Sequence, residues 1–280
     1  WTPVSPISRP TARPARTGPE PPSSNETRRT FLHIDLKQRT AVVTGGASNI
    51  GRGITLKLAD AGAQVIVVDK DEAQANATAA LRPGRIRVAA CDLSDLSQVQ
   101  SLAERLNRDE QVSVLVSNAG WVRSEYFAAK DLKEMEFELR LNLMAPLLLV
   151  RLLLPGMIER GWGRIVSVAS EAARAGQRTQ VAYSAAKGGI LGMTRSLSHE
   201  VGRYGITVNA VSPAMTIPES PEDIGQGSMQ QQRNRPPEMM AKIIKSYPVG
   251  RVGHPRDLAA AVTFLASEEE IGRASCRERV

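Results

Sequence analysis

The sequence predicts an α/β fold, a doubly wound and mostly parallel sheet with helices on both faces. Three observations lead to this class. Short apolar runs such as Thr40–Thr44 alternate with stretches of helical periodicity. The first run is followed directly by a glycine-rich turn, Gly45–Gly51. A length of 280 residues with 42% hydrophobic content suits one such domain with tails.

The first predicted unit is strand, turn and helix. Thr40–Thr44 (TAVVT) has the composition of a short buried strand, and after the turn Ile54, Leu58 and Ala61 recur at spacings of four and three. Glycines in such a turn let the backbone approach a pyrophosphate, and the helix N-terminus offers free N–H groups. The unit therefore predicts a dinucleotide-binding site.

The second predicted strand carries information on the choice of cofactor. Val65–Val68 is a continuous apolar run that ends in Asp69. A carboxylate at this place accepts hydrogen bonds from the adenosine ribose hydroxyls and repels a 2′-phosphate. Lys70 follows directly and could compensate a phosphate. The sequence favours NAD, with NADP as the less favoured cofactor.

A third pattern predicts acid/base chemistry. Tyr183 and Lys187 are four residues apart, so on a helix they share a face, and Ser170 lies thirteen residues upstream of the tyrosine. A free tyrosine titrates near pH ~10, but a neighbouring ammonium group and an oxidised nicotinamide favour the phenolate. Ser170 would hold the substrate oxygen. This set predicts the interconversion of a secondary alcohol and a ketone, with the cofactor carrying the hydride.

Together these motifs resemble the short-chain dehydrogenase/reductase family from about Phe31 to Glu269. The family's Thr-Gly-x-x-x-Gly-x-Gly corresponds to Thr44–Gly51, where Asn49 replaces the middle glycine. Asparagine tolerates left-handed backbone better than other non-glycine residues, so we expect binding to survive. The remaining family landmarks follow in order, at Asp92, Asn118-Ala119-Gly120, Asn142 and the strand Gly163–Ser170. The resemblance implies a Rossmann-type fold.

The resemblance also implies the site residues. The catalytic set is Asn142, Ser170, Tyr183 and Lys187, with Asn142 positioning a proton-relay water and Lys187 holding the nicotinamide ribose. The implied cofactor-binding set is Gly45, Ser48, Asn49, Ile50, Gly51, Asp69, Asp92, Leu93, Asn118, Ala119, Gly120, Tyr183, Lys187, Pro213 and Thr216. No metal site is predicted, because His33, His199 and His254 are scattered without a ligand pattern.

Substrate identity is expected to reside in Pro213–Tyr247, a long stretch with little regular pattern that follows the predicted strand Thr207–Val211. Such long loops are commonly lids. Its methionines either line an adaptable apolar pocket or pack at the surface: Met215, Met229, Met239 and Met240. Its basic residues suit an anionic or CoA-linked substrate or belong to a solvated helix: Arg233, Arg235, Lys242 and Lys245. A flat wall for a ring is expected from Trp121, Tyr126 and Phe127.

Both chain ends are expected to lie outside the domain of residues 31–269. Residues 1–30 hold seven prolines and five arginines with little apolar content, so we predict disorder. Residues 270–280 can be back-translated to a sequencing adapter, and we interpret them as an artefactual tail. The closing strand that the resemblance implies is not found before this tail. We therefore expect the sheet to lack its last strand and Thr207–Val211 to form an edge.

Charge argues against nucleic-acid binding. The formal net charge is +7, of which residues 1–30 contribute +3 and residues 270–280 contribute +1. The predicted domain is left with +3, too little for a basic binding face.

Composition also bears on location and assembly. There is no run of 18 apolar residues, so we expect no membrane span. Leu147–Leu154 is shorter, is interrupted by Arg151 and predicts a buried helix, which the resemblance places at the interface of a homodimer or homotetramer. Cys91 is the domain's cysteine, while Cys276 lies in the tail, so we expect no structural disulfide and a cytoplasmic location.

The sequence thus predicts an NAD-dependent oxidoreductase that interconverts a secondary alcohol and a ketone. Two alternatives stay open. One is an NADP-dependent 3-oxoacyl-thioester reductase, because the stretch Ala169–Arg174 resembles 3-oxoacyl-carrier-protein reductases as well as cyclic hydroxyacyl-CoA dehydrogenases. The other is a catalytically silent nucleotide-binding relative, against which the intact Ser170, Tyr183 and Lys187 argue.

Overall fold

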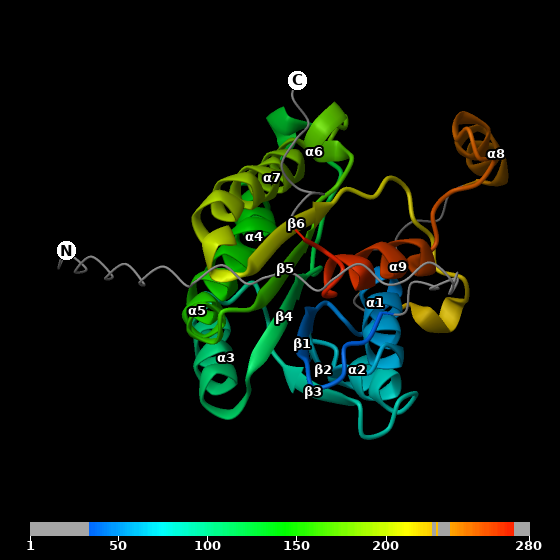
Figure 1. The fold of residues 1–280 in the computed structure, drawn as a ribbon. Coiled ribbons are helices and arrows are strands. Elements are labelled where there is room, and N and C mark those ends of the chain that lie inside the picture. Colours follow the sequence, from blue (N-terminus) through cyan, green and yellow to red (C-terminus); the bar gives the residue numbers. More distant parts are fainter. Residues whose placement is uncertain (1–33, 226–227, 229–235, 272–280) are drawn as a thin grey trace, which may run out of the picture. The chain divides into compact units, whose positions relative to one another are not determined.

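Six parallel strands form one sheet in the computed structural model, which describes residues 34–225, 228 and 236–271 (Figure 1). The strand order is β3-β2-β1-β4-β5-β6, so the chain reverses direction across the sheet between β1 and β4. This confirms the Rossmann-type fold. The bounds are β1 (Thr40–Thr44), β2 (Gln64–Asp69), β3 (Ile86–Ala90), β4 (Val112–Ser117), β5 (Gly163–Val168) and β6 (Ile206–Val211).

Some expectations concern residues outside the described ranges. They are the disorder of residues 1–30 and most of the expected tail, residues 272–280 with Cys276. His33, Met229, Arg233 and Arg235 lie outside as well. Within the described part, Glu270 is buried and its carbonyl accepts a hydrogen bond from Arg164 Nη2 at 3.4 Å.

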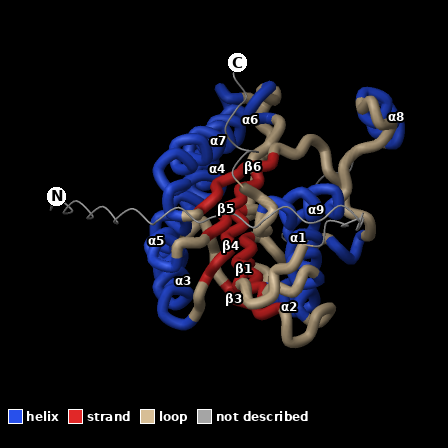
Figure 2. Tube along the Cα trace, viewed as in Figure 1, coloured by secondary structure: helices blue, strands red, loops and turns tan. Residues whose placement is uncertain are grey.

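Helices cover both faces of the sheet, as Figure 2 shows. One face packs against α1 (Asn49–Asp60), α2 (Glu72–Ala79) and α9 (Pro255–Leu265). The other packs against α3 (Leu96–Asp109), α5 (Ala145–Arg160) and α7 (Val181–Val201), with α4 (Leu132–Leu139) beside α7. Because side chains alternate along a strand, Val43 and Val65 enter the first core while Val42 and Ile66 enter the second.

The central strands β1, β2 and β4 are largely apolar because they are buried on both faces. In β1 the residues Ala41–Thr44 are all buried, and the strand has the bounds that the sequence predicted. β2 pairs with β1 in register, with Thr44 opposite Val68, so the glycine-rich turn and Asp69 emerge at the same sheet edge.

The turn after β1 requires its glycines for space. A Cβ on Gly51 would lie 1.9 Å from the Gly45 carbonyl oxygen, closer than any real contact, and Gly45 itself has a φ of +62°. Asn49 has a φ of +47°, which confirms that asparagine takes the left-handed backbone where the family has a glycine.

Asn142 lies in a wide turn of a long helix. Residues Leu132–Arg160 run as α4, a π-helical segment η2 (Arg140–Met144) and α5 without interruption. By length and composition alone this helix could cross a membrane, and its residues Leu149, Leu153 and Met157 are buried against the second face of the sheet. Wide turns of this kind are frequent at functional sites.

The region expected to carry substrate identity contains helices that the sequence did not predict. It holds η4 (Pro221–Asp223) and α8 (Pro237–Ser246). Every residue of α8 is exposed or half-buried, and Figure 1 shows the helix standing away from the sheet. The remaining short elements are η1 (Phe127–Ala129), α6 (Ala172–Ala175) and η3 (Gly202–Tyr204). In the described part of the chain β6 pairs with β5 alone and forms an edge.

Candidate active site

One cavity of ≈ 880 Å³ lies along the carboxyl ends of all six strands. It is lined by the whole predicted cofactor-binding set and by three of the four predicted catalytic residues, Ser170, Tyr183 and Lys187. Asn142 is the exception among the described residues, since it is fully buried behind the cavity wall. Parallel strands end at one edge of the sheet, which is why residues from distant motifs meet here.

The turn Gly45–Gly51 has the form of a phosphate cradle. It lines the cavity, and Ser48 precedes α1 without a side-chain hydrogen bond to the described first turn of the helix. The first N–H groups of α1 therefore receive no side-chain oxygen from Ser48, and they form the positive end of the helix dipole. A pyrophosphate would fit this set of donors. Because Gly51 has no side chain, the Gly45 backbone can pack directly against the start of α1.

Asp69 lies at the end of β2 inside the cavity. Its Oδ2 accepts a hydrogen bond from the Ala47 backbone N–H at 3.1 Å, and its Oδ1 accepts one from the Asp71 N–H at 3.1 Å. Burial raises the pKa of this carboxyl, while the backbone hydrogen bonds act to lower it. Each carboxylate oxygen keeps a second acceptor position, so the held carboxylate fits two ribose hydroxyls.

The Asn118-Ala119-Gly120 turn is tied to β1. Asn118 Nδ2 donates to the carbonyls of Thr44 and Gly45, both at 3.0 Å. The Thr44 hydroxyl accepts from the backbone N–H groups of Asn118 and Ala119 at 3.0 and 3.1 Å. The Asn118 side chain therefore fixes the position of the cavity wall, and it affects a cofactor through the shape of that wall.

Asp92 and Leu93 lie at the end expected to hold the adenine. Asp92 Oδ1 accepts from the Ser94 N–H and hydroxyl at 2.9 and 2.7 Å, which orients the carboxylate. Beside it Cys91 is a buried free thiol whose pKa is raised to about 11 by burial and by the Asp92 charge. This thiol is therefore inert near neutral pH.

The predicted catalytic residues meet across two elements. Ser170 follows β5, and its Oγ accepts the Ala172 N–H at 3.1 Å, which leaves the hydroxyl proton to donate. Tyr183 and Lys187 lie one turn apart on α7, with Lys187 Nζ 5.8 Å from the tyrosine ring centroid. Nζ donates to the Val168 carbonyl at 2.9 Å. Burial lowers the pKa of Lys187 to about 8.

Asn142 uses its side chain on the backbone. Nδ2 donates to the carbonyls of Trp121 and Glu138 at 2.7 and 2.8 Å, and Oδ1 accepts the Trp121 N–H at 3.2 Å. Its side-chain amide therefore holds the segment after Gly120, and any role in a proton relay falls to its backbone.

Several residues of the cavity lining were not predicted from the sequence. Asp71 caps α2 by accepting from the Gln74 N–H at 3.0 Å, and the Asp-x-x-Gln spacing is a readable capping signal. Gln74 Nε2 in turn donates to the Glu222 carbonyl at 3.2 Å, and Arg52 pairs with Asp223 at 3.2 Å. The start of the region after β6 is thus anchored over the nucleotide end, which local sequence patterns do not reveal.

The expected flat wall is correct in part. Trp121 lines the cavity, but Tyr126 and Phe127 are 60% and 57% exposed and lie outside its described lining. The turn η1 directs them outward, and the guanidinium carbon of Arg178 lies 5.9 Å from the centroid of the Tyr126 ring. Of the predicted methionines, Met215 and Met239 line the cavity. Among the described residues no group of three His, Cys, Asp or Glu is arranged to hold a metal.

A phosphate cradle, a ribose-binding carboxylate and a Ser/Tyr/Lys set in one cavity define a nicotinamide-dependent oxidoreductase. Residues 39–227 match the family described as short chain dehydrogenase. The chain belongs to this family and is an NAD(P)-dependent oxidoreductase of alcohols and ketones.

Similar proteins within the family differ in substrate. The chain is 32% identical to the 3-oxoacyl-[acyl-carrier-protein] reductase FabG of Rickettsia prowazekii, over 84% of the chain and 91% of that protein. It is 34% identical to the 2,3-dihydroxy-2,3-dihydro-p-cumate dehydrogenase of Pseudomonas putida, over 84% and 90%. A solved structure with bound NADP, assigned as an NAD(P)-dependent gluconate 5-dehydrogenase from Beutenbergia cavernae, is 33% identical with a TM-score of 0.75, over 84% and 92%.

Proposed function

We propose that this enzyme prefers NAD and uses Tyr183 as its acid/base. The observation that carries the cofactor choice is Asp69, held inside the cavity by two backbone N–H groups. A carboxylate there attracts ribose hydroxyls and repels a 2′-phosphate. Asp92 would accept from the adenine amine, and the N-terminus of α1 would hold the pyrophosphate.

The chain's own residues would move the proton. Bound nicotinamide supplies or accepts the hydride. Ser170 donates its hydroxyl proton to the substrate oxygen and fixes the reacting carbon. Tyr183 Oη takes the alcohol proton during oxidation and returns it during reduction. The Lys187 ammonium, one helical turn away, stabilises the phenolate, and its N–H groups not used on Val168 would hold the nicotinamide ribose.

The alternative is an NADP-linked 3-oxoacyl-thioester reductase. Two observations support it, the similarity to the Rickettsia prowazekii reductase and the cation Lys70 beside Asp69 in the cavity lining. Lys242 and Lys245 of α8 would suit the phosphates of a thioester carrier. The similarity to the gluconate 5-dehydrogenase favours a third substrate class, polyhydroxy acids.

We also propose that the enzyme works in the cytoplasm as a homodimer or homotetramer. The reduced, buried Cys91 suits a reducing compartment. Exposed apolar side chains along the α4–α5 and α7 helices, such as Leu132, Met144 and Val181, suit a helical interface. Light scattering coupled to size-exclusion chromatography would measure the assembly, and a monomer would contradict it.

The test is a fluorescence titration with NADH and NADPH, followed by reduction assays on acetoacetyl-CoA, 5-ketogluconate and ethyl acetoacetate. We expect tighter binding of NADH. Tyr183→Phe is expected to keep NADH binding within about twofold and to lower kcat by roughly 10²–10⁴-fold, since it removes only the transferable proton. Tighter NADPH binding would favour the alternative, and a Phe variant as active as wild type would exclude Tyr183 as the acid/base.

A further inference from the structure

A buried ion pair lies directly behind the substrate end of the cavity. Lys130 Nζ is 2.6 Å from Glu138 Oε1, and the two side chains are only 6% and 1% exposed. Neither residue belongs to the described lining of the cavity. Buried charges destabilise a fold unless they are paired and hydrogen-bonded, so the groups that this pair binds indicate what it does.

The pair holds the backbone of Arg123, the residue that follows the cavity-lining residues Trp121 and Val122. Glu138 Oε1 accepts the backbone N–H of Arg123 at 2.8 Å, and Lys130 Nζ donates to the carbonyl of Arg123 at 2.8 Å. The backbone N–H of Arg123 is therefore bound to the buried carboxylate, and its carbonyl is bound to the buried ammonium group. Bonds to charged partners are stronger than neutral ones.

The helix that carries Glu138 also carries Asn142, which holds the wall at Trp121, two residues before Arg123. Asn142 binds both backbone groups of Trp121, and it also donates to the carbonyl of Glu138 at 2.8 Å. Glu138 is thus the point where the two attachments meet, through its carboxylate to Arg123 and through its carbonyl to Asn142.

The held segment, Trp121–Arg123, borders the reacting groups. Trp121 and Val122 line the cavity and follow Gly120 directly. A Cβ on Gly120 would lie 2.9 Å from Asn142 Oδ1 and 3.5 Å from Lys187 Nζ, so this part of the wall already packs closely against the catalytic lysine. A displacement of the segment would therefore move the surface beside Lys187.

We propose that Glu138 and Lys130 are positioning residues, which set the geometry of the substrate end by fixing Trp121–Arg123. They act through hydrogen bonds to the backbone of Arg123, without touching substrate or cofactor. The proposal rests on the oxidoreductase activity of the family and holds for either cofactor. Displacements of about 1 Å at a reacting centre cost up to about a hundredfold in rate, so the expected effect is on kcat.

The test compares three variants of the ion pair and one control variant with wild type, all in the full chain and saturated with NADH or NADPH. Glu138→Gln and Lys130→Met each leave one buried charge without its partner. The double variant Lys130→Met/Glu138→Leu removes both charges and refills the space, a change that often restores stability. Glu136→Gln is the matched control, because the Glu136–Arg140 pair on the same helix is 66% and 57% exposed.

Two readouts separate positioning from stability. The chain is labelled with 5-fluorotryptophan, and the ¹⁹F resonance of Trp121 is assigned through Trp121→Phe. In parallel kcat is measured on whichever of acetoacetyl-CoA, 5-ketogluconate and ethyl acetoacetate wild type reduces fastest. We expect the single variants to shift the Trp121 resonance and to lower kcat about tenfold, with the nucleotide Kd within about twofold.

The double variant decides between the two roles. If the pair positions the wall, this variant regains the melting temperature but keeps the shifted Trp121 resonance and the low kcat. If it regains all three, the pair is structural and the proposal is overturned. Should the single variants fail to fold, the double variant alone supplies the test. Should wild type reduce none of the ketones, the proposed substrates fail, while the Trp121 resonance still decides the positioning role.

Discussion

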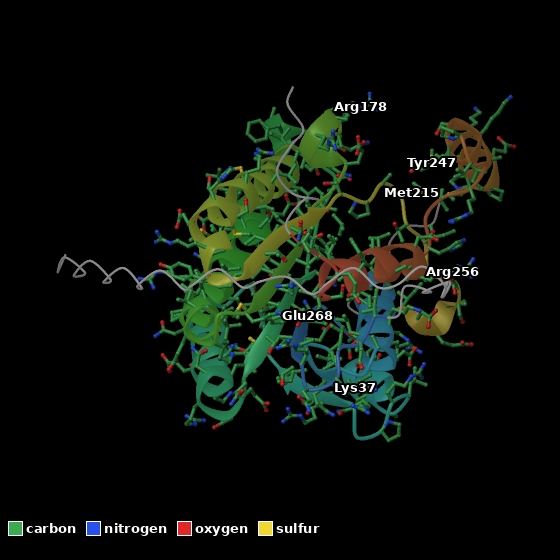
Figure 3. The ribbon with its side chains drawn as sticks, in the orientation of Figure 1. Lys37, Arg178, Met215, Tyr247, Arg256 and Glu268 are labelled. Atoms are coloured by element: carbon green, nitrogen blue, oxygen red, sulfur yellow. The ribbon has the colours of Figure 1, made fainter. Side chains whose placement is uncertain are left out.

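The two ends of the cavity are built by different means. At the nucleotide end the wall consists of backbone at the ends of β1, β2 and β4, packed so closely that a Cβ on Gly51 would overlap the Gly45 carbonyl. At the substrate end the wall consists of side chains from α4, α7 and the region after β6, and Met239 of α8 is 50% exposed. Figure 3 labels Met215, which precedes α8 in this region, and Tyr247, which directly follows the helix. The Met215 N–H donates to the Tyr247 hydroxyl at 3.0 Å.

The difference explains why one end is easy to recognise and the other is not. Close backbone approach demands glycine at set positions, so the nucleotide end leaves a motif in the sequence. A wall of side chains accepts many residue types, and a half-exposed helix adds little to stability. Relatives with about a third of their residues identical accordingly carry names with different substrates, a 3-oxoacyl-[acyl-carrier-protein], a 2,3-dihydroxy-2,3-dihydro-p-cumate and gluconate.

The largest expected effect breaks the nucleotide end. Gly51→Ala places a Cβ 1.9 Å from the Gly45 oxygen and 2.5 Å from Asn118 Nδ2, so the turn must open. We expect NADH binding to weaken at least about a hundredfold, since the pyrophosphate donors lose their alignment. Fluorescence titration measures it. Gly202→Ala is the control, because its Cβ would meet open space. Unchanged binding by Gly51→Ala would show that the turn is looser than the structure has it.

A second variant concerns Lys187, which joins the two ends. Its pKa in the folded state is about 8, below the ordinary 10.5. Below pH 8 the folded protein keeps a buried charge, and stability should rise between pH 8 and 10.5, where the unfolded chain binds more protons. Lys187→Met should raise apo-protein stability at pH 7 by up to about 3 kcal/mol and flatten that rise, while abolishing activity. Urea unfolding at several pH values measures both, and an unchanged pH dependence would contradict it.

A smaller effect should sharpen the cofactor side of the comparison. Asp69→Asn removes the charge that faces the ribose, and we expect the ratio of NADH to NADPH affinity to fall about tenfold, or about 1.4 kcal/mol. Titration with both nucleotides measures the ratio. Asp71→Asn is the matched control two residues away, since asparagine caps α2 as well as aspartate does. An equal fall in both variants would assign the preference to net charge rather than to Asp69.

The smallest effect is expected at α8. Met239→Ser changes a half-exposed residue that lines the cavity, so the melting temperature should stay within about 1 °C, as for most surface changes. The KM of the reduced ketone should rise about threefold if α8 contacts the substrate. Met240→Ser is the comparison, because Met240 lies outside the described lining. Equal KM values in both variants would remove α8 from the substrate site.

Local chemistry made much of this protein readable from its sequence. Thr40–Thr44 was predicted with its observed bounds because a strand buried on both faces must be apolar throughout. Three other short-range patterns each indicate one chemical role: the turn at Gly45–Gly51, Asp69 at a strand end, and the spacing of Tyr183 and Lys187. They were enough to predict the Rossmann-type fold and the cofactor-binding residues that line the cavity.

Contacts between distant segments were decided only by the tertiary structure. In sequence Lys130 and Glu138 resemble ordinary charges of a solvated helix, and only packing places them 2.6 Å apart and buried around Arg123. Asn142 resembles a residue facing the cavity, yet its amide is used on Trp121. Periodicity records which face of an element is buried, whereas the partner of a buried polar group depends on how other elements pack against it.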